Sequence, residues 1–96
     1  MEYGIKTDVI QEIKDLAGKY HLKKVILFGS RARGDFRKTS DIDLAVQGGD
    51  TTRFALDVEE EVSTLLFFDV VDLDAPVQAE LLNSIVQEGK VIFEEI

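Results

Sequence analysis

Short runs rich in β-branched residues alternate along this chain with longer segments of helical periodicity. Between Thr7 and Tyr20, apolar residues recur at steps of three and four, as one buried face of a helix requires. Residues 24–28 form an apolar run that predicts a buried strand. In residues 41–46, apolar and polar side chains alternate, which predicts a strand with one buried face.

The rest of the chain continues this alternation. Residues 31–40 are polar and predict a loop. The remaining predicted elements are a helix after Asp50 with an apolar stripe at Phe54, Val58, Val62 and Leu65, a strand over 67–73, a third helix after Pro76, and an edge strand at 91–93. This order predicts an α/β fold in which helices cover one face of a small mixed sheet.

The size and composition predict one small domain. The chain has 96 residues, of which 45% are hydrophobic, and no cysteine, so its stability depends on an apolar core without disulfides. We expect a single domain over residues 1–96. No apolar run approaches the ~20 residues of a membrane span, and the N-terminus does not resemble a signal peptide. We therefore expect a cytoplasmic protein that does not enter the membrane.

Charge is distributed unevenly along the chain. The net charge is −8, which argues against stable nucleic-acid binding by this chain alone. Residues 1–38 carry +4 and residues 39–96 carry −12. Six of the eleven basic residues fall within residues 23–38, just before Asp41 and Asp43. This pattern predicts a site with cations for phosphate beside carboxylates for a metal.

Asp41 and Asp43 carry the clearest chemical signal. Side chains two residues apart on a strand share a face and lie roughly 6–7 Å apart. Two carboxylates so placed repel each other unless a cation lies between them. Their hard oxygen atoms favour Mg²⁺ or Mn²⁺, and Mg²⁺ completes its coordination with water and substrate phosphate.

Gly29 and Ser30 follow the predicted strand 24–28 and provide a phosphate site. Glycine lets a phosphate approach the backbone, and backbone N–H groups and the Ser30 hydroxyl can donate to its oxygens. The guanidinium groups of Arg31 or Arg33 can add charge-assisted hydrogen bonds. If the strands 24–28 and 41–46 are neighbours, a triphosphate at Gly29 reaches a metal at the aspartates. This layout predicts nucleotidyl transfer.

The segment from Phe28 to Leu44 resembles the signature of the minimal nucleotidyltransferases, the MNT group of the DNA polymerase β-like superfamily. It contains Phe-Gly-Ser-Arg-Ala-Arg-Gly at 28–34 and Ser-Asp-Ile-Asp-Leu at 40–44. The similarity covers essentially the whole chain, including residues 69–73 and the ending from Ala79 onward. It implies the polymerase β-like palm fold and a nucleotidyltransferase activity.

The resemblance also implies a third carboxylate on the strand 67–73, for which Asp69, Asp72 and Asp74 compete. Asp69 is favoured because it precedes an apolar pair at the start of the strand. Asp72 points to the opposite face of a regular strand, so both cannot serve without a bulge, and it stays an alternative.

The implied mechanism uses two Mg²⁺ ions, with Mn²⁺ as an alternative, and ATP as substrate. The third carboxylate helps to deprotonate the acceptor hydroxyl, AMP is transferred, and pyrophosphate leaves. The implied site residues are Asp41, Asp43 and Asp69 for catalysis and metal binding, and Gly29, Ser30, Arg31 and Arg33 for the nucleotide.

Members of this size resemble the antitoxin half of toxin–antitoxin pairs. The resemblance implies a small helical HEPN-type partner protein and transfer of AMP from ATP to a tyrosine of that partner. Exposed apolar residues among 66–68 would mark a surface for this partner or for self-association. The acidic residues 39–96 predict that the partner is basic where it docks.

Two other functions stay open. The chain can be a catalytically idle module that neutralises its partner by contact, or an adenylyltransferase acting on a small molecule such as an antibiotic. The paired carboxylates favour an enzyme, since a binding module has no need of them. The missing acceptor domain counts against a small-molecule substrate.

Overall fold

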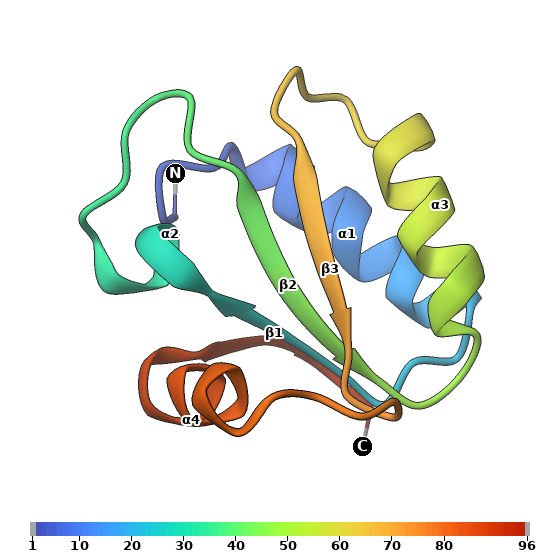
Figure 1. The fold of residues 1–96 in the computed structure, drawn as a ribbon. Coiled ribbons are helices and arrows are strands. Elements are labelled where there is room, and N and C mark those ends of the chain that lie inside the picture. Colours follow the sequence, from blue (N-terminus) through green and yellow to red (C-terminus); the bar gives the residue numbers. More distant parts are fainter. Residues whose placement is uncertain (1, 96) are drawn as a thin grey trace.

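Within residues 2–95, eight helices and strands follow one another close to the predicted order (Figure 1). The computed structural model describes residues 2–95. None of the helices in this part of the chain is long and apolar enough to cross a membrane. The elements are α1 (Thr7–Lys19), β1 (Lys24–Phe28), α2 (Gly29–Arg33), β2 (Ile42–Gln47), α3 (Thr51–Glu61), β3 (Phe68–Asp72), α4 (Ala79–Glu88) and β4 (Lys90–Glu94).

The strands form one mixed sheet in the order β3-β2-β1-β4. β1 pairs antiparallel with both β2 and β4, while β2 pairs parallel with β3. The predicted edge strand is therefore β4, and β3 forms the other edge. Because of these directions, the end of β1 lies at the same end of the sheet as the beginnings of β2 and β3 (Figure 1).

The main core lies between the sheet and the helices α1 and α3, which cover one face (Figure 1). This burial confirms the alternation predicted for the second strand and the apolar face predicted for the first helix. The strand residues in this core are Val25, Leu27, Ile42, Leu44 and Val46, and the helices contribute Val9, Ile10, Ile13, Leu16, Ala17, Phe54 and Val58.

The helix α4 packs on the opposite face, so the expectation that all helices cover one face is corrected. Its Ile85 is buried in a second apolar cluster with Phe28 of β1 and Ala45 of β2. β1 is apolar on both sides, and α1 covers only one of them, so the other needs its own cover. The unbroken apolar run over residues 25–28 is the sequence signal for this second layer.

The helix α3 ends at Glu61, which excludes Leu65 from its predicted apolar stripe. The side chain of Leu65 is instead fully exposed, at 100%. The backbone N–H and the hydroxyl of Ser63 both donate to the carboxylate of Glu12 on α1, at 3.1 and 2.9 Å. These contacts hold the chain in a turn beyond α3, and no local periodicity in the sequence could reveal them.

The predicted loop over 31–40 begins instead with the short helix α2. Gly34 ends this helix in the left-handed conformation, with φ at +93°, and its N–H donates to the carbonyl of Ser30. Such a glycine is a common end for a helix. The remaining residues 35–41 form a loop that leads into β2.

Candidate functional site

Three chain segments meet at one end of the sheet and bring Gly29, Asp43 and Asp69 together. Phe28, the last residue of β1, pairs with Asp43 of β2, and Asp43 pairs with Asp69 of β3. Gly29 follows Phe28 directly and begins α2. Neighbouring strands lie about 4.8 Å apart, and paired residues point to the same face. The two carboxylates therefore stand side by side, next to the Gly-Ser turn.

Gly29 provides the space that the carboxylate of Asp43 occupies. The φ of Gly29 is +75°, a conformation that other residues rarely adopt. A Cβ at this position would overlap the Oδ2 atom of Asp43. The Asp43 carboxylate thus lies directly against the backbone at the start of α2.

The environment of Asp43 disfavours its charge. The pKa of Asp43 is raised to about 6, first because the side chain is partly buried and then because Asp69 and Asp41 are negatively charged. The positive charges of Arg33 and Arg31 act in the opposite direction. A cation bound between the carboxylates would relieve this repulsion.

The donor set at this end of the sheet fits a hard divalent cation. Asp43 and Asp69 offer carboxylate oxygens from adjacent strands, and Mg²⁺ is usually held by one or two carboxylates. Asp41, just before β2, is exposed and close enough to Asp43 to raise its pKa. Within residues 2–95, no three carboxylate or imidazole side chains are already gathered tightly enough to hold a metal ion. The sheet therefore preforms a pair of carboxylates, and Asp41 stands beside it.

The other two candidates for the third carboxylate have different partners. The side chain of Asp72 is on the opposite face from that of Asp69, because Asp72 lies three positions further along the strand and successive side chains alternate in direction. Its carboxylate accepts hydrogen bonds from the Thr51 hydroxyl at 3.0 Å and from the backbone N–H of Asp74 at 2.9 Å. Asp74 accepts one from the N–H of Gly48 at 2.8 Å. Of these three aspartates, only Asp69 lies at the site.

Arg31 does not reach the surface where a phosphate would bind. Its side chain is 1% exposed, and its guanidinium donates to the backbone carbonyls of Tyr3, Gly4 and Ser40. These carbonyl oxygens compensate the burial of a charge that would otherwise destabilise the fold. The expectation that Arg31 contacts phosphate is therefore corrected, since each guanidinium nitrogen already donates to the protein.

Arg33 remains near the site but forms ion pairs with other side chains. Its guanidinium lies 3.0 Å from Glu88 at the end of α4 and 3.4 Å from Asp35. The side chain is 46% exposed, and exposed ion pairs contribute little to stability. Replacement of these partners by a phosphate would therefore cost little. The positive charge of Arg33 also acts on Asp43, where it opposes the burial and the negative charges that raise the pKa.

Gly4 and Phe36 lie against Arg31 and were not identified from the sequence. Gly4 has a left-handed φ of +68°, and the centre of the Phe36 ring lies 5.1 Å from the guanidinium. Phe36 is an aromatic residue in an otherwise polar loop, a signal that can mark such a contact. Gly4 carries no such signal, because its contacts come from residues distant in the sequence.

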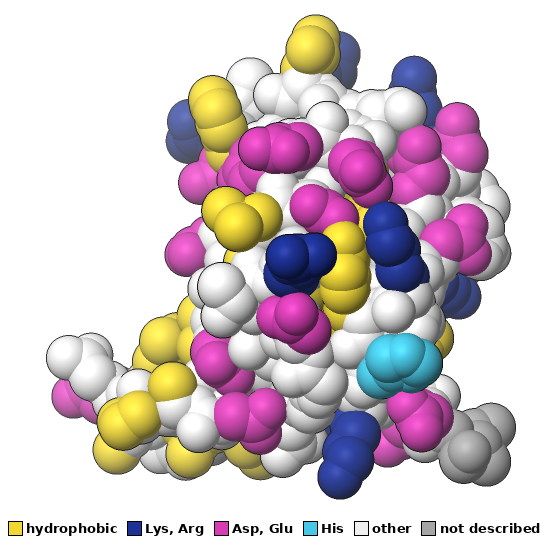
Figure 2. Space-filling model, turned by 90° about the vertical axis from the view of Figure 1, so that its right-hand side faces the viewer, with side chains coloured by type: hydrophobic (Ala, Val, Ile, Leu, Met, Phe, Trp, Pro, Cys, Tyr) yellow, Lys and Arg dark blue, Asp and Glu magenta, His cyan; other side chains and the backbone are white. Residues whose placement is uncertain are grey.

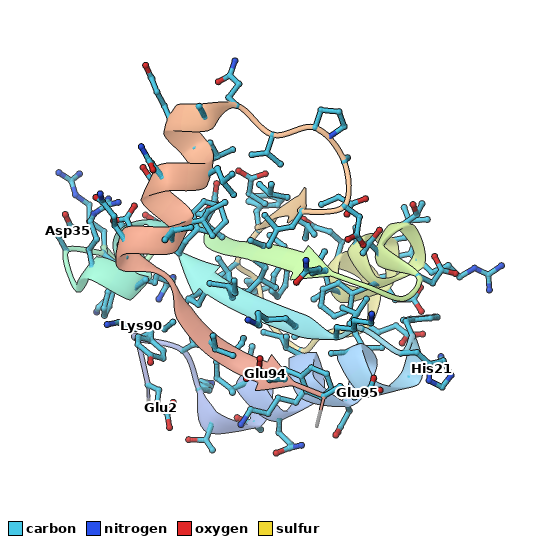
Figure 3. The ribbon with its side chains drawn as sticks, turned by 90° about the horizontal axis from the view of Figure 1, so that it is seen from below. Glu2, His21, Asp35, Lys90, Glu94 and Glu95 are labelled. Atoms are coloured by element: carbon cyan, nitrogen blue, oxygen red, sulfur yellow. The ribbon has the colours of Figure 1, made fainter. Side chains whose placement is uncertain are left out.

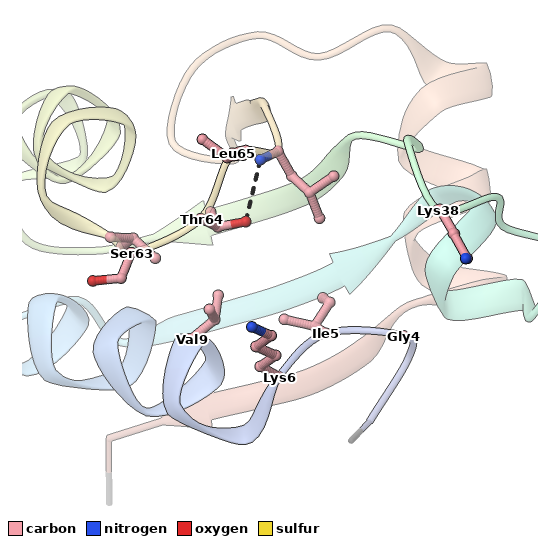
Figure 4. A pocket seen from close by; sticks show the side chains of 10 residues that line it. Gly4, Ile5, Lys6, Val9, Lys38, Ser63, Thr64 and Leu65 are labelled. Atoms are coloured by element: carbon pink, nitrogen blue, oxygen red, sulfur yellow. Dashed lines mark hydrogen bonds between the residues drawn. The ribbon is translucent and has the colours of Figure 1, made fainter.

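Two other features lie away from the carboxylates. A hollow of about 610 Å³ lies between the start of α1 and the connection from α3 to β3, where Lys6 and Lys38 border it (Figure 4). None of Gly29, Asp43 and Asp69 lines it. His21 lies at the opposite end of the molecule from Asp35, which follows α2, so it is remote from the site (Figure 3).

Residues 11–95 match the family model described as polymerase beta, nucleotidyltransferase. The chain belongs to this nucleotidyltransferase family. The match includes all three segments that meet at the site. The α/β fold and the nucleotidyltransferase class predicted from the sequence are therefore confirmed.

Proteins similar to this nucleotidyltransferase include a protein named an adenylyltransferase and a chain of a toxin–antitoxin complex. A Methanocaldococcus jannaschii protein, provisionally named a protein adenylyltransferase, is 33% identical over 93 residues, covering 84% of this chain and 90% of that protein. A chain in a crystal structure of a toxin–antitoxin with AMP-PNP has a TM-score of 0.71 and 26% identity, covering 90% of this chain and 73% of that one.

A third similar chain occurs in a Shewanella oneidensis complex of a tri-AMPylated HEPN toxin with an MNT antitoxin. Its TM-score is 0.66 at 23% identity, covering 95% of this chain and 74% of that one. At this identity the likeness shows the fold. The resemblance to MNT antitoxins stated from the sequence is thus confirmed at the level of structure.

Proposed function

We propose that this nucleotidyltransferase transfers AMP from ATP to a tyrosine hydroxyl of a HEPN-type partner protein, in a Mg²⁺-dependent reaction, and thereby acts as an antitoxin. The observation that carries the proposal is the pairing of Asp43 with Asp69 on adjacent strands, directly beside Gly29. The transfer of AMP and the kind of partner are supported by the similar proteins, among them a complex with an AMPylated HEPN toxin.

The Gly-Ser turn binds the triphosphate of ATP in this proposal. The Asp43 carboxylate fills the space at Gly29, and beside it the backbone N–H groups at the start of α2 and the Ser30 hydroxyl can donate to the β- or γ-phosphate. Arg33 lies at the rim and can exchange its exposed ion pairs for a phosphate oxygen.

Asp43 and Asp69, with Asp41 beside them, are the residues that would hold Mg²⁺. When bound, such ions stabilise negative charge on the attacking and leaving oxygens of an in-line displacement. Asp43 lies against the start of α2, so it connects the metal ligands to the phosphate site. Its pKa is raised first by burial and then by the negative charges of Asp69 and Asp41, and a bound cation would offset both effects.

Asp69 faces the acceptor. It is exposed and lies on the edge strand β3, so an incoming side chain reaches it without passing other elements of the sheet. Its carboxylate accepts the phenolic proton while the tyrosine oxygen forms a bond to the α-phosphorus. The bond from the α-phosphorus to the bridging oxygen breaks, and pyrophosphate leaves with that electron pair.

The connection from α3 to β3 offers apolar surface for a partner. Leu65 is 100% exposed and Phe67 is 72% exposed, whereas Leu66 and Phe68 are half-buried. Large apolar side chains gathered in this way are typical of interaction sites. Acidic side chains spread over the neighbouring face that carries α3, and they favour a basic partner (Figure 2).

The same exposed residues also favour a second function, neutralisation of the partner by contact alone. The two functions differ in their dependence on the carboxylates. Neutralisation by contact requires Leu65 and Phe67 but not Asp43. Transfer of AMP requires both the apolar surface with Leu65 and Phe67 and the carboxylate site with Asp43.

The test is a transfer assay with the full chain, α-³²P-labelled ATP, Mg²⁺ and the protein encoded by the neighbouring gene. Transfer predicts that the partner gains label and the mass of one or more AMP groups, and that its acceptor is a tyrosine. Asp43→Asn should abolish labelling. Asp15→Asn, which changes an exposed aspartate on α1, is the matched control and should leave labelling unchanged.

Neutralisation of the partner by the Asp43→Asn variant at the wild-type level would contradict the transfer mechanism and support contact alone. Rapid labelling of an aminoglycoside in the absence of any protein partner would instead support a small-molecule acceptor.

A further inference from the structure

Arg31 is the only charged or polar residue among those described that is buried, at 1% exposed. Burial of a guanidinium is costly unless its donors are satisfied. Burial lowers the pKa of Arg31, and the negative charges of Asp41 and Asp43 act against that change. The fold therefore keeps a buried cation on which the charges of Asp41 and Asp43, two residues of the candidate metal site, act directly.

The guanidinium joins two segments that are distant in the sequence. Its Nη1 atom donates to the carbonyls of Tyr3 and Gly4, each at 3.1 Å. Its Nε and Nη2 atoms both donate to the carbonyl of Ser40, at 3.1 and 2.9 Å. One planar guanidinium thus holds the turn at Tyr3 and Gly4, the N-terminal turn, on one side and the end of the 35–41 loop on the other.

Gly4 and Phe36 close around this guanidinium. The Phe36 ring lies over the guanidinium, with 5.1 Å from the ring centre to the central carbon. A Cβ at Gly4 would overlap the Phe36 ring and lie 3.0 Å from Nη1 of Arg31. The packing therefore requires glycine at position 4, because a side chain there would displace the Phe36 ring from Arg31.

The Ser40 carbonyl belongs to the peptide bond that joins Ser40 to Asp41. The orientation of this peptide therefore sets the position of the Asp41 backbone. Two N–H groups on one carbonyl oxygen restrict that peptide more than a single hydrogen bond does. The turn before it is further restricted because the Ser40 N–H donates to the Arg37 carbonyl at 3.0 Å, and the Arg37 N–H donates to the Ser40 hydroxyl at 2.8 Å.

We propose that Arg31 is a positioning residue for the transfer reaction: through the Ser40 carbonyl it holds Asp41 beside Asp43, and the N-terminal turn is thereby part of the site. This inference rests on the proposed function, because it assumes that Asp41 binds the metal. It assigns Arg31 no contact with substrate. Lysine cannot replace it, since an ammonium has no planar fork to hold two segments at once.

The test measures Mn²⁺ binding to the full chain in the presence of AMP-PNP by electron paramagnetic resonance, alongside transfer rate and thermal unfolding. Arg31→Lys should weaken Mn²⁺ binding at least tenfold and slow transfer by a similar factor in protein that is still folded. Arg53→Lys, at an exposed arginine on α3, is the control and should change neither quantity. In the Asp41→Asn background, Arg31→Lys should weaken Mn²⁺ binding less than twofold further, because both changes act on one ligand.

Phe36→Leu is a milder variant in case Arg31→Lys unfolds the protein. It removes the ring from the guanidinium, and we expect about threefold weaker Mn²⁺ binding in folded protein. Wild-type Mn²⁺ affinity and transfer rate in either folded variant, or equal losses with and without Asp41, would overturn the positioning role. Failure of the wild-type chain to bind Mn²⁺ would instead overturn the proposed metal site itself, which distinguishes the two outcomes.

Discussion

Asp43 on β2 and Asp69 on β3 are paired in register across parallel strands, although twenty-five other residues separate them in the chain. The connection through α3 returns the chain so that two negative charges stand on one face of the sheet. Burial of Asp43 raises its pKa, and the negative charges of Asp69 and Asp41 raise it further, to about 6. A folded protein accepts such repulsion where function requires it, and perturbed acids gather at functional sites.

The stability of the metal-free protein should depend on the protonation of Asp43. Its pKa rises from an ordinary 3.8 to about 6 on folding, so the folded state binds the proton more tightly than the unfolded state. The destabilisation is therefore absent below pH 4 and complete above pH 6. Asp43→Asn should raise the unfolding free energy at pH 7 by about 1 kcal/mol, a value discounted because the group is partly exposed. Urea unfolding of both proteins at pH 4 and 7 tests this, and an equal gain at both pH values would contradict it.

Asp69 and Asp72 should separate activity from stability. Asp69→Asn should reduce the transfer rate by at least a hundredfold and leave thermal stability nearly unchanged, because its side chain is exposed. Asp72→Asn should weaken the hydrogen bonds that the Asp72 carboxylate accepts from the Thr51 hydroxyl and the Asp74 N–H. It should lower the free energy of unfolding by about 1 kcal/mol and leave transfer intact. Steady-state kinetics and thermal unfolding of both variants check this. A reversal of the two effects would assign the third carboxylate to Asp72.

Gly29→Ala should disrupt the site by steric overlap as well as by backbone strain. The new Cβ overlaps Asp43, and the φ of +75° disfavours any side chain. Gly34→Ala is the matched control: its φ is +93°, but no atom lies within 4 Å of the added Cβ. Both variants should lose about 1–2 kcal/mol of stability, but only Gly29→Ala should weaken Mg²⁺-ATP binding, by at least tenfold in calorimetry. Equal ATP affinities in the two variants would argue against a nucleotide at Gly29.

Leu65 and Phe67 should act in partner binding and not in folding. Leu65→Ser with Phe67→Ser should change the unfolding free energy by less than about 0.5 kcal/mol, because neither side chain is buried. Binding of the partner, measured by calorimetry, should weaken at least tenfold. Val86→Ser changes a side chain on α4 that is 74% exposed and serves as the control. A loss of binding as large in this control would show that the interface lies elsewhere.

Local patterns in the sequence were sufficient for the order of the four strands and of the helices α1, α3 and α4, but they missed the short helix α2. The face that each residue of β2 presents follows from alternation, because successive strand residues point to opposite sides. The Gly29-Ser30 pair and the pair of Asp41 and Asp43 were recognisable because the members of each pair lie next to each other or two positions apart in the sequence. Alternation along β3 showed only that Asp69 and Asp72 cannot both serve, and the position of Asp69 before an apolar pair favoured it. The register of β3 then sets Asp69 beside Asp43.

Tertiary structure alone decided the rest, because it depends on contacts between residues far apart in the chain. The sequence presents Arg31 as a cation within a phosphate motif. In the fold it meets the carbonyls of Tyr3 and Gly4, whose positions are set by how the N-terminal turn docks. Likewise, the side of the sheet that α4 covers depends on which face of β1 is left uncovered by α1. Periodicity shows that a residue is buried, but only the packed chain determines its partners.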